Sequence, residues 1–227
     1  MAGDSLFRAP DLLPRIASAI VMLLLVGVDI WLGGSAFVVF VLVVSAGVYW
    51  EWWGLARHLA NGVGLALWML VGAVYIGVSA FALIDLRAMG LAIAGQLLAM
   101  VIAVDIGAYF AGRAIGGPKI APSISPSKTW AGLGGGVFAA SLTYAAFMPW
   151  NYHDFPPQPG RMVGLSLIAG GGVAVVAQAG DFFESWMKRR AGLKDSGRLI
   201  PGHGGLFDRV DGLVAVLFVI ACVRAAG

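Results

Sequence analysis

Residues 181–211 read DFFESWMKRRAGLKDSGRLIPGHGGLFDRVD, from Asp181 to Asp211, and they are the most densely charged stretch of the chain. These 31 residues hold 11 of the 27 formal charges, of which five are carboxylates and six are cations. Ionisable groups are costly near a bilayer, so an apolar chain does not gather them for packing alone. Charges of both signs beside a glycine-rich turn predict a site for a metal ion and a phosphorylated substrate.

The rest of the chain is apolar enough to indicate a membrane protein. Of its 227 residues, 59% are hydrophobic and 12% are charged, whereas about a quarter of the residues in soluble domains are charged. The single cysteine, Cys222, lies in an apolar run, which excludes a disulfide framework and a cysteine-based metal site. No cleavable signal peptide is evident, because the first apolar run is long enough to span. We expect an all-α, polytopic bundle of membrane helices, and no nucleic acid partner.

Seven segments are candidates for membrane spans, since a spanning helix needs about 20 mostly apolar residues. They lie at roughly 13–32, 33–53, 62–84, 89–112, 129–149, 162–180 and 208–225. Gly33 and Gly34 predict a tight hairpin between the first two spans. Trp50, Trp52 and Trp53 are typical of an aromatic belt at the membrane interface.

The distribution of Lys and Arg orients these spans. With the N-terminus inside, twelve of the 15 basic residues fall in inside segments, and only Arg87, Arg161 and Arg224 fall outside. This bias predicts that the charged stretch faces the cytoplasm, where nucleotides are available. Only 12 residues separate Asp211 from Arg224, so the last span must borrow polar ends or let Arg224 snorkel.

Two cytoplasmic connections are long, at 113–128 and 181–207. The start of the first connection divides the chain into N-terminal membrane helices, 1–112, and a C-terminal catalytic region, 113–227. The prolines, glycines and serines of the first connection predict a loop rather than a helix.

The second connection begins with a segment of amphipathic character. We expect 181–192 to form a short helix that ends at Gly192 and lays Phe182, Trp186 and Met187 on the membrane. The glycine-rich part that follows predicts a loop.

Glycine also clusters inside two predicted spans, at 134–136 and 170–172. Small residues let helices approach closely, so we favour a packing role for these clusters. The same glycines could equally give a substrate room beside the backbone.

Two pairs of carboxylates flank the glycine-rich turn. Asp181 and Glu184 are three residues apart on a predicted helix and share a face, and Asp208 and Asp211 repeat this spacing at the start of the last span. If the two pairs face each other, they form a compact site of oxygen ligands, which suits a hard cation such as Mg²⁺. Salt bridges with neighbouring cations are the alternative.

Fixed positive charge surrounds these acids. A polyphosphate needs such charge, and Arg can bind it bidentately. The candidate phosphate contacts are Lys188, Arg189, Lys194, Arg198 and Arg209. The alternative is an anchor for anionic lipid, which is a sufficient role for Arg190.

His203 lies in the sequence PGHGG, where glycines on both sides allow unusual backbone angles and close approach to a ligand. Its position near Asp208 favours a functional role. His58 and His153 lack such a context, and we interpret both as solvated or interfacial.

Two further features lie before the charged stretch. Asp105 is a carboxylate inside the fourth predicted span, which makes it a functional candidate with Arg113 or Lys128 as partner. In PSISPSKTW, hydroxyl groups, backbone N–H groups and one lysine precede a predicted helix and could hold a phosphate, although the spacing is not that of a Walker A loop. The residues concerned are Ser123, Ser125, Ser127, Lys128 and Thr129.

Together these motifs resemble the signature of the phosphatidate cytidylyltransferases, also called CDP-diacylglycerol synthases. The matching pattern in Ser185–Asp211 is S-x-x-K-R, four residues, K-D-x-G, and then P-G-H-G-G-x-x-D-R-x-D. QAGDFFES at 178–185, VDIGAYFAGR at 104–113 and SPSKTWAG at 125–132 resemble three further motifs of that family. The likeness is close in the C-terminal half and only general in the N-terminal spans.

Three residues depart from the family pattern. Ile106 stands where Thr or Ser is usual, Ala131 where Glu is common, and Gly212 where Ser is common. A polar contact made by those side chains is missing here. The chain is also short for the family, by one or two N-terminal spans.

The resemblance implies a reaction in which CTP and phosphatidic acid give CDP-diacylglycerol and pyrophosphate. It implies Mg²⁺, with K⁺ as a companion ion, a homodimer, and a multi-pass protein of the inner or plasma membrane with its active site facing the cytoplasm. The implied metal ligands are Asp181, Glu184, Asp208 and Asp211. The implied catalytic residues are Asp105, Lys128, Asp181, Lys194, His203, Asp208 and Arg209. The implied substrate-binding residues are Ser125, Ser127, Lys128, Thr129, Ser185, Lys188, Arg189, Lys194, Gly204, Gly205 and Arg209.

Three other interpretations remain open at this point. A CTP-dependent polyprenol kinase would share the membrane helices and the anion site, but it lacks the long K-D…P-G-H-G-G…D-R-x-D run. An ion-coupled transporter places its charges near the membrane midplane in repeated halves, whereas these charges lie at one face and no repeat is visible. A scaffold without activity is the third, and the intact set of acids and bases argues against it.

Overall fold

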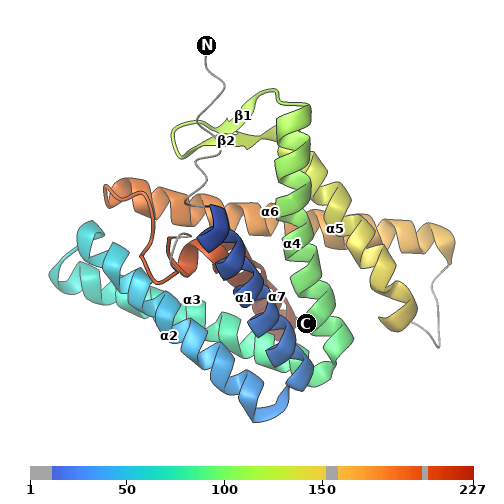
Figure 1. Cartoon of the computed structure of the whole chain (residues 1–227), viewed down its shortest axis with the longest axis horizontal. Coiled ribbons are helices and arrows are strands. Elements are labelled where there is room, and N and C mark those ends of the chain that lie inside the picture. The colour runs from blue at the N-terminus through green and yellow to red at the C-terminus, as the bar shows by residue number, and fades with distance from the viewer. Residues whose placement is uncertain (1–11, 152–157, 201–203) are drawn as a thin grey trace.

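The computed structural model describes residues 12–151, 158–200 and 204–227, which form seven helices and one small hairpin (Figure 1). The helices are α1 (Leu12–Leu32), α2 (Gly34–Leu59), α3 (Gly62–Met89), α4 (Leu91–Ala114), α5 (Trp130–Asn151), α6 (Pro159–Arg190) and α7 (Phe207–Ala226). The strands are β1 (Lys119–Ala121) and β2 (Ser125–Thr129), paired antiparallel.

Five helices are long and apolar enough to cross a membrane. They are Gly34–Leu59, Gly62–Met89, Leu91–Ala114, Trp130–Pro149 and Gly160–Arg190 within the described residues. This confirms the multi-pass character that the composition predicts. In the last helix, α7, charges at both ends dilute the apolar stretch, and Arg224 pairs with Asp85 of α3 at 2.5 Å.

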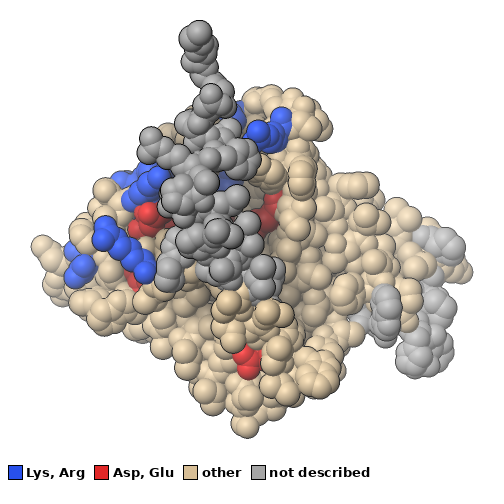
Figure 2. Space-filling model, in the orientation of Figure 1, with Lys and Arg blue, Asp and Glu red and all other residues tan. Residues whose placement is uncertain are grey.

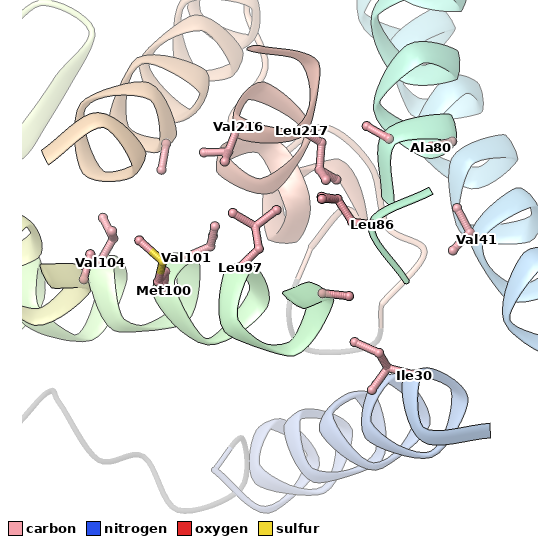
Figure 3. Packing of buried hydrophobic residues seen from close by; sticks show 14 of the residues in the cluster. Ile30, Val41, Ala80, Leu86, Leu97, Met100, Val101, Val104, Val216 and Leu217 are labelled. Carbon is pink, nitrogen blue, oxygen red and sulfur yellow. The ribbon is translucent and has the colours of Figure 1, made fainter. Parts of the chain in front are cut away.

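The helices pack as two pairs joined by α6 and α7. In Figure 1, α2 and α3 lie side by side, α4 and α5 pack together on the other side, and α6 runs across the molecule. Helix α7 packs against both α3 and α6. Figure 3 shows the apolar core at this junction. Its buried residues include Ile30, Val41, Ala80, Leu86, Leu97, Met100, Val101, Val104, Val216 and Leu217.

Glycines at several crossings permit close contact between helices. A side chain at Gly136 would meet the backbone oxygen of Val104 at 3.2 Å, and Gly135 and Gly170 are more crowded still. By contrast, a Cβ atom added at Gly134, Gly171 or Gly172 would meet no neighbour within 4 Å. The packing role predicted for the two glycine clusters is therefore confirmed for some members only.

The turn between α1 and α2 forms where the two glycines in the sequence predict it. Gly33 and Gly34 both adopt positive φ, 65° and 59°, which glycine tolerates without a steric penalty. Arg87 of α3 donates hydrogen bonds to the carbonyl oxygens of Ile30 and Trp31 at the end of α1. The predicted tight hairpin is confirmed, and its carbonyl groups are paired.

Helix α6 runs without a break to Arg190, so the separate short helix predicted at 181–192 is instead the end of the sixth span. The helix stops at Gly192, as predicted, because glycine takes the left-handed conformation with φ 70°. The N–H of Leu193 bonds to the carbonyl of Lys188, and the N–H of Gly192 to that of Arg189, in a Schellman motif.

Two predictions for side chains at the membrane surface also need correction. Met187 is fully buried rather than on the membrane surface, and it packs in one cluster with Trp52 and Phe207. Trp52 is likewise 0% exposed, whereas Trp50 is 63% exposed. Trp52 therefore belongs to the core, because its helix turns that face toward α3 and α7, and its ring N–H bonds to the carbonyl of Trp68.

The connection predicted as a loop at 113–128 contains the hairpin. Lys119 pairs with Thr129 and Ala121 pairs with Ser125, and the Ile124 N–H closes the turn on the Ala121 carbonyl. Sequence patterns miss this strand because SPSKT includes a proline, which is tolerated only at a sheet edge.

Candidate active site

The end of α6 and the start of α7 bring the predicted carboxylates together. The two helices run antiparallel, and glycines allow them to lie close: a side chain at Gly180 would meet the carbonyl oxygen of Asp211 at 2.7 Å. Gly212 faces Ala177 in the same way, with 3.2 Å to its carbonyl oxygen. The residue that departs from the family pattern at 212 therefore lies at a close helix contact.

As a result of this packing, each carboxylate of α6 is grouped with a carboxylate of α7, and not with the second carboxylate of its own helix. Glu184 of α6 and Asp208 of α7 meet on the ammonium group of Lys188. Asp181 and Asp211 lie one turn farther from the loop and within electrostatic range of each other. The i, i+3 pairs that the sequence suggests are thus divided between two sets.

We call Glu184, Lys188, Ser196 and Asp208 the Lys188 set. The Lys188 ammonium contacts Glu184 and lies 2.5 Å from Oδ1 of Asp208. The side chains of Glu184 and Asp208 are only 1% and 9% exposed. Because an unpaired charge is costly in such a place, the shared ammonium stabilises negative charge on these two carboxylates.

The second oxygen of Asp208 is held by the loop that precedes α7. Its Oδ2 accepts hydrogen bonds from the Ser196 N–H at 3.0 Å, the Ser196 hydroxyl at 3.0 Å and the Gly205 N–H at 2.8 Å. Asp208 lies in the first turn of α7, where a negative charge also interacts well with the helix dipole. This carboxylate is therefore fixed in orientation.

We call Asp105, Lys128, Asp181 and Asp211 the Lys128 set. The Lys128 ammonium lies 2.5 Å from Oδ2 of Asp181, and the Ser185 hydroxyl donates to Oδ1 at 3.3 Å. The side chains of Lys128 and Asp181 are 19% and 35% exposed, so this set is more open than the first. The Lys128 ammonium also lies 4.9 Å from the ring centre of Phe182.

Asp105 also belongs to this set, although it lies on a different helix, α4. It lies within electrostatic range of Lys128 and Asp181. Of the two partners that the sequence suggests, Lys128 lies within electrostatic range of Asp105, as does Arg209, whereas Arg113 lies near the hydroxyl of Tyr109 at 3.4 Å.

The candidate residues of the hairpin differ in their contacts and in their exposure. The Thr129 hydroxyl accepts the Gly132 N–H at 3.0 Å and so caps α5, and its side chain is buried. Ser127 is exposed and Ser125 is partly exposed. Arg189 of α6 lies 3.5 Å from the carbonyl of Ile124 in the hairpin turn, which ties the hairpin to the site.

Exposed cations border the two sets. Figure 2 shows Lys and Arg gathered toward the upper left of the view, beside Asp and Glu, while most of the remaining surface carries no charge. The exposed members near the loop are Arg189, Arg190, Lys194, Arg198 and Arg209. Arg190 lies over the ring of Trp186 at 5.4 Å, which supports the simpler role as an interfacial anchor.

Part of the glycine-rich turn can be located. Gly204 has φ 84°, and a side chain there would approach Asp208 and Asp195 at 3.3 and 3.5 Å. Gly205 is buried between Ser196 and Glu51. His203 lies outside the described residues.

Sequence reasoning missed Glu51 of α2. Its side chain is 3% exposed and accepts hydrogen bonds from the N–H groups of Leu206 and Phe207 and from the Ser196 hydroxyl. The only signal in the sequence is an acidic residue within a tryptophan cluster, YWEWW. Its partners are about 150 residues away along the chain, so spacing could not reveal them.

The donor chemistry of the two sets suits Mg²⁺, because this ion prefers oxygen ligands. No three Asp, Glu, His or Cys side chains form a ready metal cluster within the ranges that the structure describes. In the Lys188 set a cationic ammonium lies between two carboxylates, which marks a point suited to positive charge. Mg²⁺ usually takes one or two carboxylates together with water and substrate phosphates, so the carboxylates of either set are sufficient in number.

Known proteins resemble this chain over most of its length. A family model described as the cytidylyltransferase family matches residues 57–226. A phosphatidate cytidylyltransferase of Brucella suis biovar 1 (strain 1330) is 36% identical, and the match covers 90% of each chain. Proteins of that name from Pseudomonas aeruginosa and Rickettsia bellii are 35% and 34% identical. The match covers 95% of this chain and 72% of the first, and 91% of this chain and 89% of the second.

Proposed function

This chain belongs to the cytidylyltransferase family, and from that premise we propose that it makes CDP-diacylglycerol and pyrophosphate from CTP and phosphatidic acid. The names of its relatives support this substrate pair. The observation that carries the proposal is the convergence of two carboxylate and lysine sets, from α4, β2, α6 and α7, at one end of an apolar helix bundle.

In the proposed reaction, a phosphate oxygen of phosphatidic acid attacks the α-phosphorus of CTP. The bond between the α-phosphorus and the bridging oxygen of the β-phosphate breaks, and pyrophosphate leaves with that electron pair. Little covalent chemistry falls to the protein, so positioning and charge neutralisation supply most of the rate acceleration. Two anions must meet, which makes cationic side chains necessary.

The exposed cations are suited to that task. Lys194, Arg189 and Arg209 lie around the loop and can bind the phosphates of CTP and the leaving pyrophosphate. Lys128 is partly exposed beside Asp181 and can turn toward a phosphate, and the Ser185 hydroxyl contacts the same Asp181. Ser125 and Ser127 lie on the same strand as Lys128. Lys188 is less free to move, because two buried carboxylates hold its ammonium.

We further propose that Mg²⁺ binds here with the substrates, held by Asp181, Glu184, Asp208 and Asp211, with K⁺ as a companion ion. When bound, the metal would neutralise the charge that builds up on the phosphates. Asp208 is already oriented by two backbone N–H groups of the loop, and Asp181 is more exposed than either carboxylate of the Lys188 set. His203 in the same loop is proposed to approach the phosphates.

The membrane arrangement follows from the charges. We propose seven spans, with α1 and α7 added to the five apolar helices, and an active site at the cytoplasmic face. The bias of Lys and Arg toward that face supports this orientation. A homodimer is proposed by analogy with the family alone.

The test is a reaction with purified protein, CTP, phosphatidic acid and Mg²⁺, scored for pyrophosphate and CDP-diacylglycerol. We expect both products in equal amounts, with no reaction when EDTA is present. Folded protein that forms neither product would refute the proposed activity.

A labelled nucleotide separates this activity from that of a lipid kinase. Label from the α-phosphate of CTP enters the lipid in a cytidylyltransferase, whereas label from the γ-phosphate enters it in a kinase. Transfer of the γ-label, or solute uptake into sealed vesicles without nucleotide, would favour the kinase or the transporter.

A further inference from the structure

Glu51 lies on α2, six residues before the segment that the family model matches, and its buried carboxylate reaches into the loop that carries the site. Its Oε1 accepts the Leu206 N–H at 3.0 Å, and its Oε2 accepts the Phe207 N–H at 2.8 Å and the Ser196 hydroxyl at 2.9 Å. Both oxygens are used, so an amide of the same shape cannot replace the carboxylate.

These contacts fix the start of α7. The N–H groups at a helix start have no partners within the helix and need an acceptor. At α7 the acceptor comes from another helix, because Glu51 of α2 binds the N–H groups just before and at the helix start. Asp208 is the next residue of α7, so Glu51 sets where its backbone lies.

The glycines of the loop leave room for this carboxylate. A side chain at Gly205 would lie 2.6 Å from Oε2 of Glu51, and one at Gly197 would also collide with the Glu51 carboxylate. At these two positions the close neighbour is a buried side chain of the protein. Part of the K-D-x-G and G-G pattern is therefore explained by Glu51.

Ser196 connects Glu51 to Asp208. Its hydroxyl oxygen lies 2.9 Å from Oε2 of Glu51 and 3.0 Å from Oδ2 of Asp208, but it has only one proton to donate. When that proton goes to Glu51, Asp208 keeps the two backbone donors and has more acceptor capacity for a cation. When it goes to Asp208, that capacity is reduced.

We propose that Glu51 is a positioning residue for the reaction: it fixes the loop and directs the Ser196 hydroxyl so that Asp208 stays available to a divalent cation. This rests on the proposed function, because it assigns Asp208 a role with Mg²⁺. Glu51 itself contacts neither metal nor substrate in this role.

The decisive variant is Glu51→Gln, compared with Ser79→Ala as a matched control. Ser79 is also buried and also joins a helix to α7, through the Val214 carbonyl at 2.8 Å, but it lies away from the loop. For Glu51→Gln we expect kcat to fall about 10- to 100-fold and the Mg²⁺ concentration for half-maximal activity to rise. The KM for phosphatidic acid should change little, and Ser79→Ala should keep wild-type Mg²⁺ dependence.

Hydrogen–deuterium exchange gives a readout that does not depend on turnover. In Glu51→Gln, exchange should increase in peptides that cover 195–208 and stay unchanged in α4 and α5. If wild-type protein makes no liponucleotide, the proposed function fails, while the exchange result still tests whether Glu51 holds the loop. Unchanged exchange and unchanged Mg²⁺ dependence in a folded Glu51→Gln protein would overturn the proposal.

A double-mutant cycle tests the connection through Ser196. Ser196→Ala keeps the backbone N–H on Asp208 but removes the hydroxyl. If Ser196 transmits the effect, the Mg²⁺ requirement of the Glu51→Gln, Ser196→Ala protein should be no higher than that of Glu51→Gln alone. Additive increases would show that the two residues act independently and would contradict the relay.

Discussion

The Lys188 set and the Lys128 set contain the same chemistry, carboxylates around one lysine, but differ in how they are held. Glu184 and Asp208 are almost wholly buried, and Asp208 is held by two backbone N–H groups of the loop and lies 3.0 Å from the Ser196 hydroxyl. Asp181 is 35% exposed and is held by Lys128 and Ser185. One set is thus fixed by the protein, and the other is open to a ligand.

This difference suggests a division of labour. A fixed carboxylate needs no reorganisation when charge develops, which is the property of a preorganised site. A lysine at an open pair can exchange its carboxylate partner for a substrate phosphate at little cost, because exposed ion pairs contribute about 1 kcal/mol or less. We interpret the Lys188 set as the fixed part of the site and the Lys128 set as the part that responds to substrate.

The largest effect should come from Asp208→Asn. The amide would place an NH₂ group toward donors or toward the Lys188 ammonium, where an acceptor is required. We expect CDP-diacylglycerol formation to fall about 1000-fold, with insertion into the membrane retained. Turnover of the purified, folded variant measures this, and near-normal turnover would refute the proposed role of Asp208.

Replacing each lysine by Met sharpens the comparison. Lys188→Met leaves two buried carboxylates without their ammonium, so we expect a stability loss of about 3–5 kcal/mol. Lys128→Met should lower kcat/KM about 100-fold and change stability by about 1 kcal/mol or less. Thermal unfolding in detergent and initial rates measure the two effects. If the two variants lose equal stability, the proposed difference between fixed and open sets is wrong.

Much of this arrangement could be predicted from sequence, for a physical reason. Helix length and hydropathy depend on neighbouring residues, so the apolar spans and the stop at Gly192 were predictable. The helix register across the bundle was not, and it is the register that pairs Glu184 with Asp208 on Lys188. Glu51 shows the same limit, because only packing of α2 against the loop reveals its partners.

The Gly180 contact tests whether the two sets depend on close packing of α6 and α7. In Gly180→Ala the added methyl would meet the Asp211 carbonyl oxygen and the Ala215 side chain, which must move apart. We expect a stability loss of about 1–3 kcal/mol and roughly 10-fold lower activity, because both sets straddle this interface.

Gly171→Ala is the matched control, since it lies in the same helix and the new methyl would meet no neighbour within 4 Å. It should keep activity and gain slightly in stability, because Ala favours helix more than Gly does. Equal losses in both variants would indicate a general effect of glycine on α6, rather than on the interface of the two sets.

The smallest effect is expected at Cys222, which lies on α7 about three turns beyond Asp211. Its side chain is exposed on the helix bundle, away from the carboxylates, so its thiol is not needed to hold either set. Cys222→Ser should keep activity within about twofold of wild type, as is usual for an exposed position without special contacts. Initial rates at saturating CTP measure this. A large loss would mean that the part of α7 far from the loop is coupled to the site. The site would then depend on a third group of residues, besides the Lys188 set and the Lys128 set.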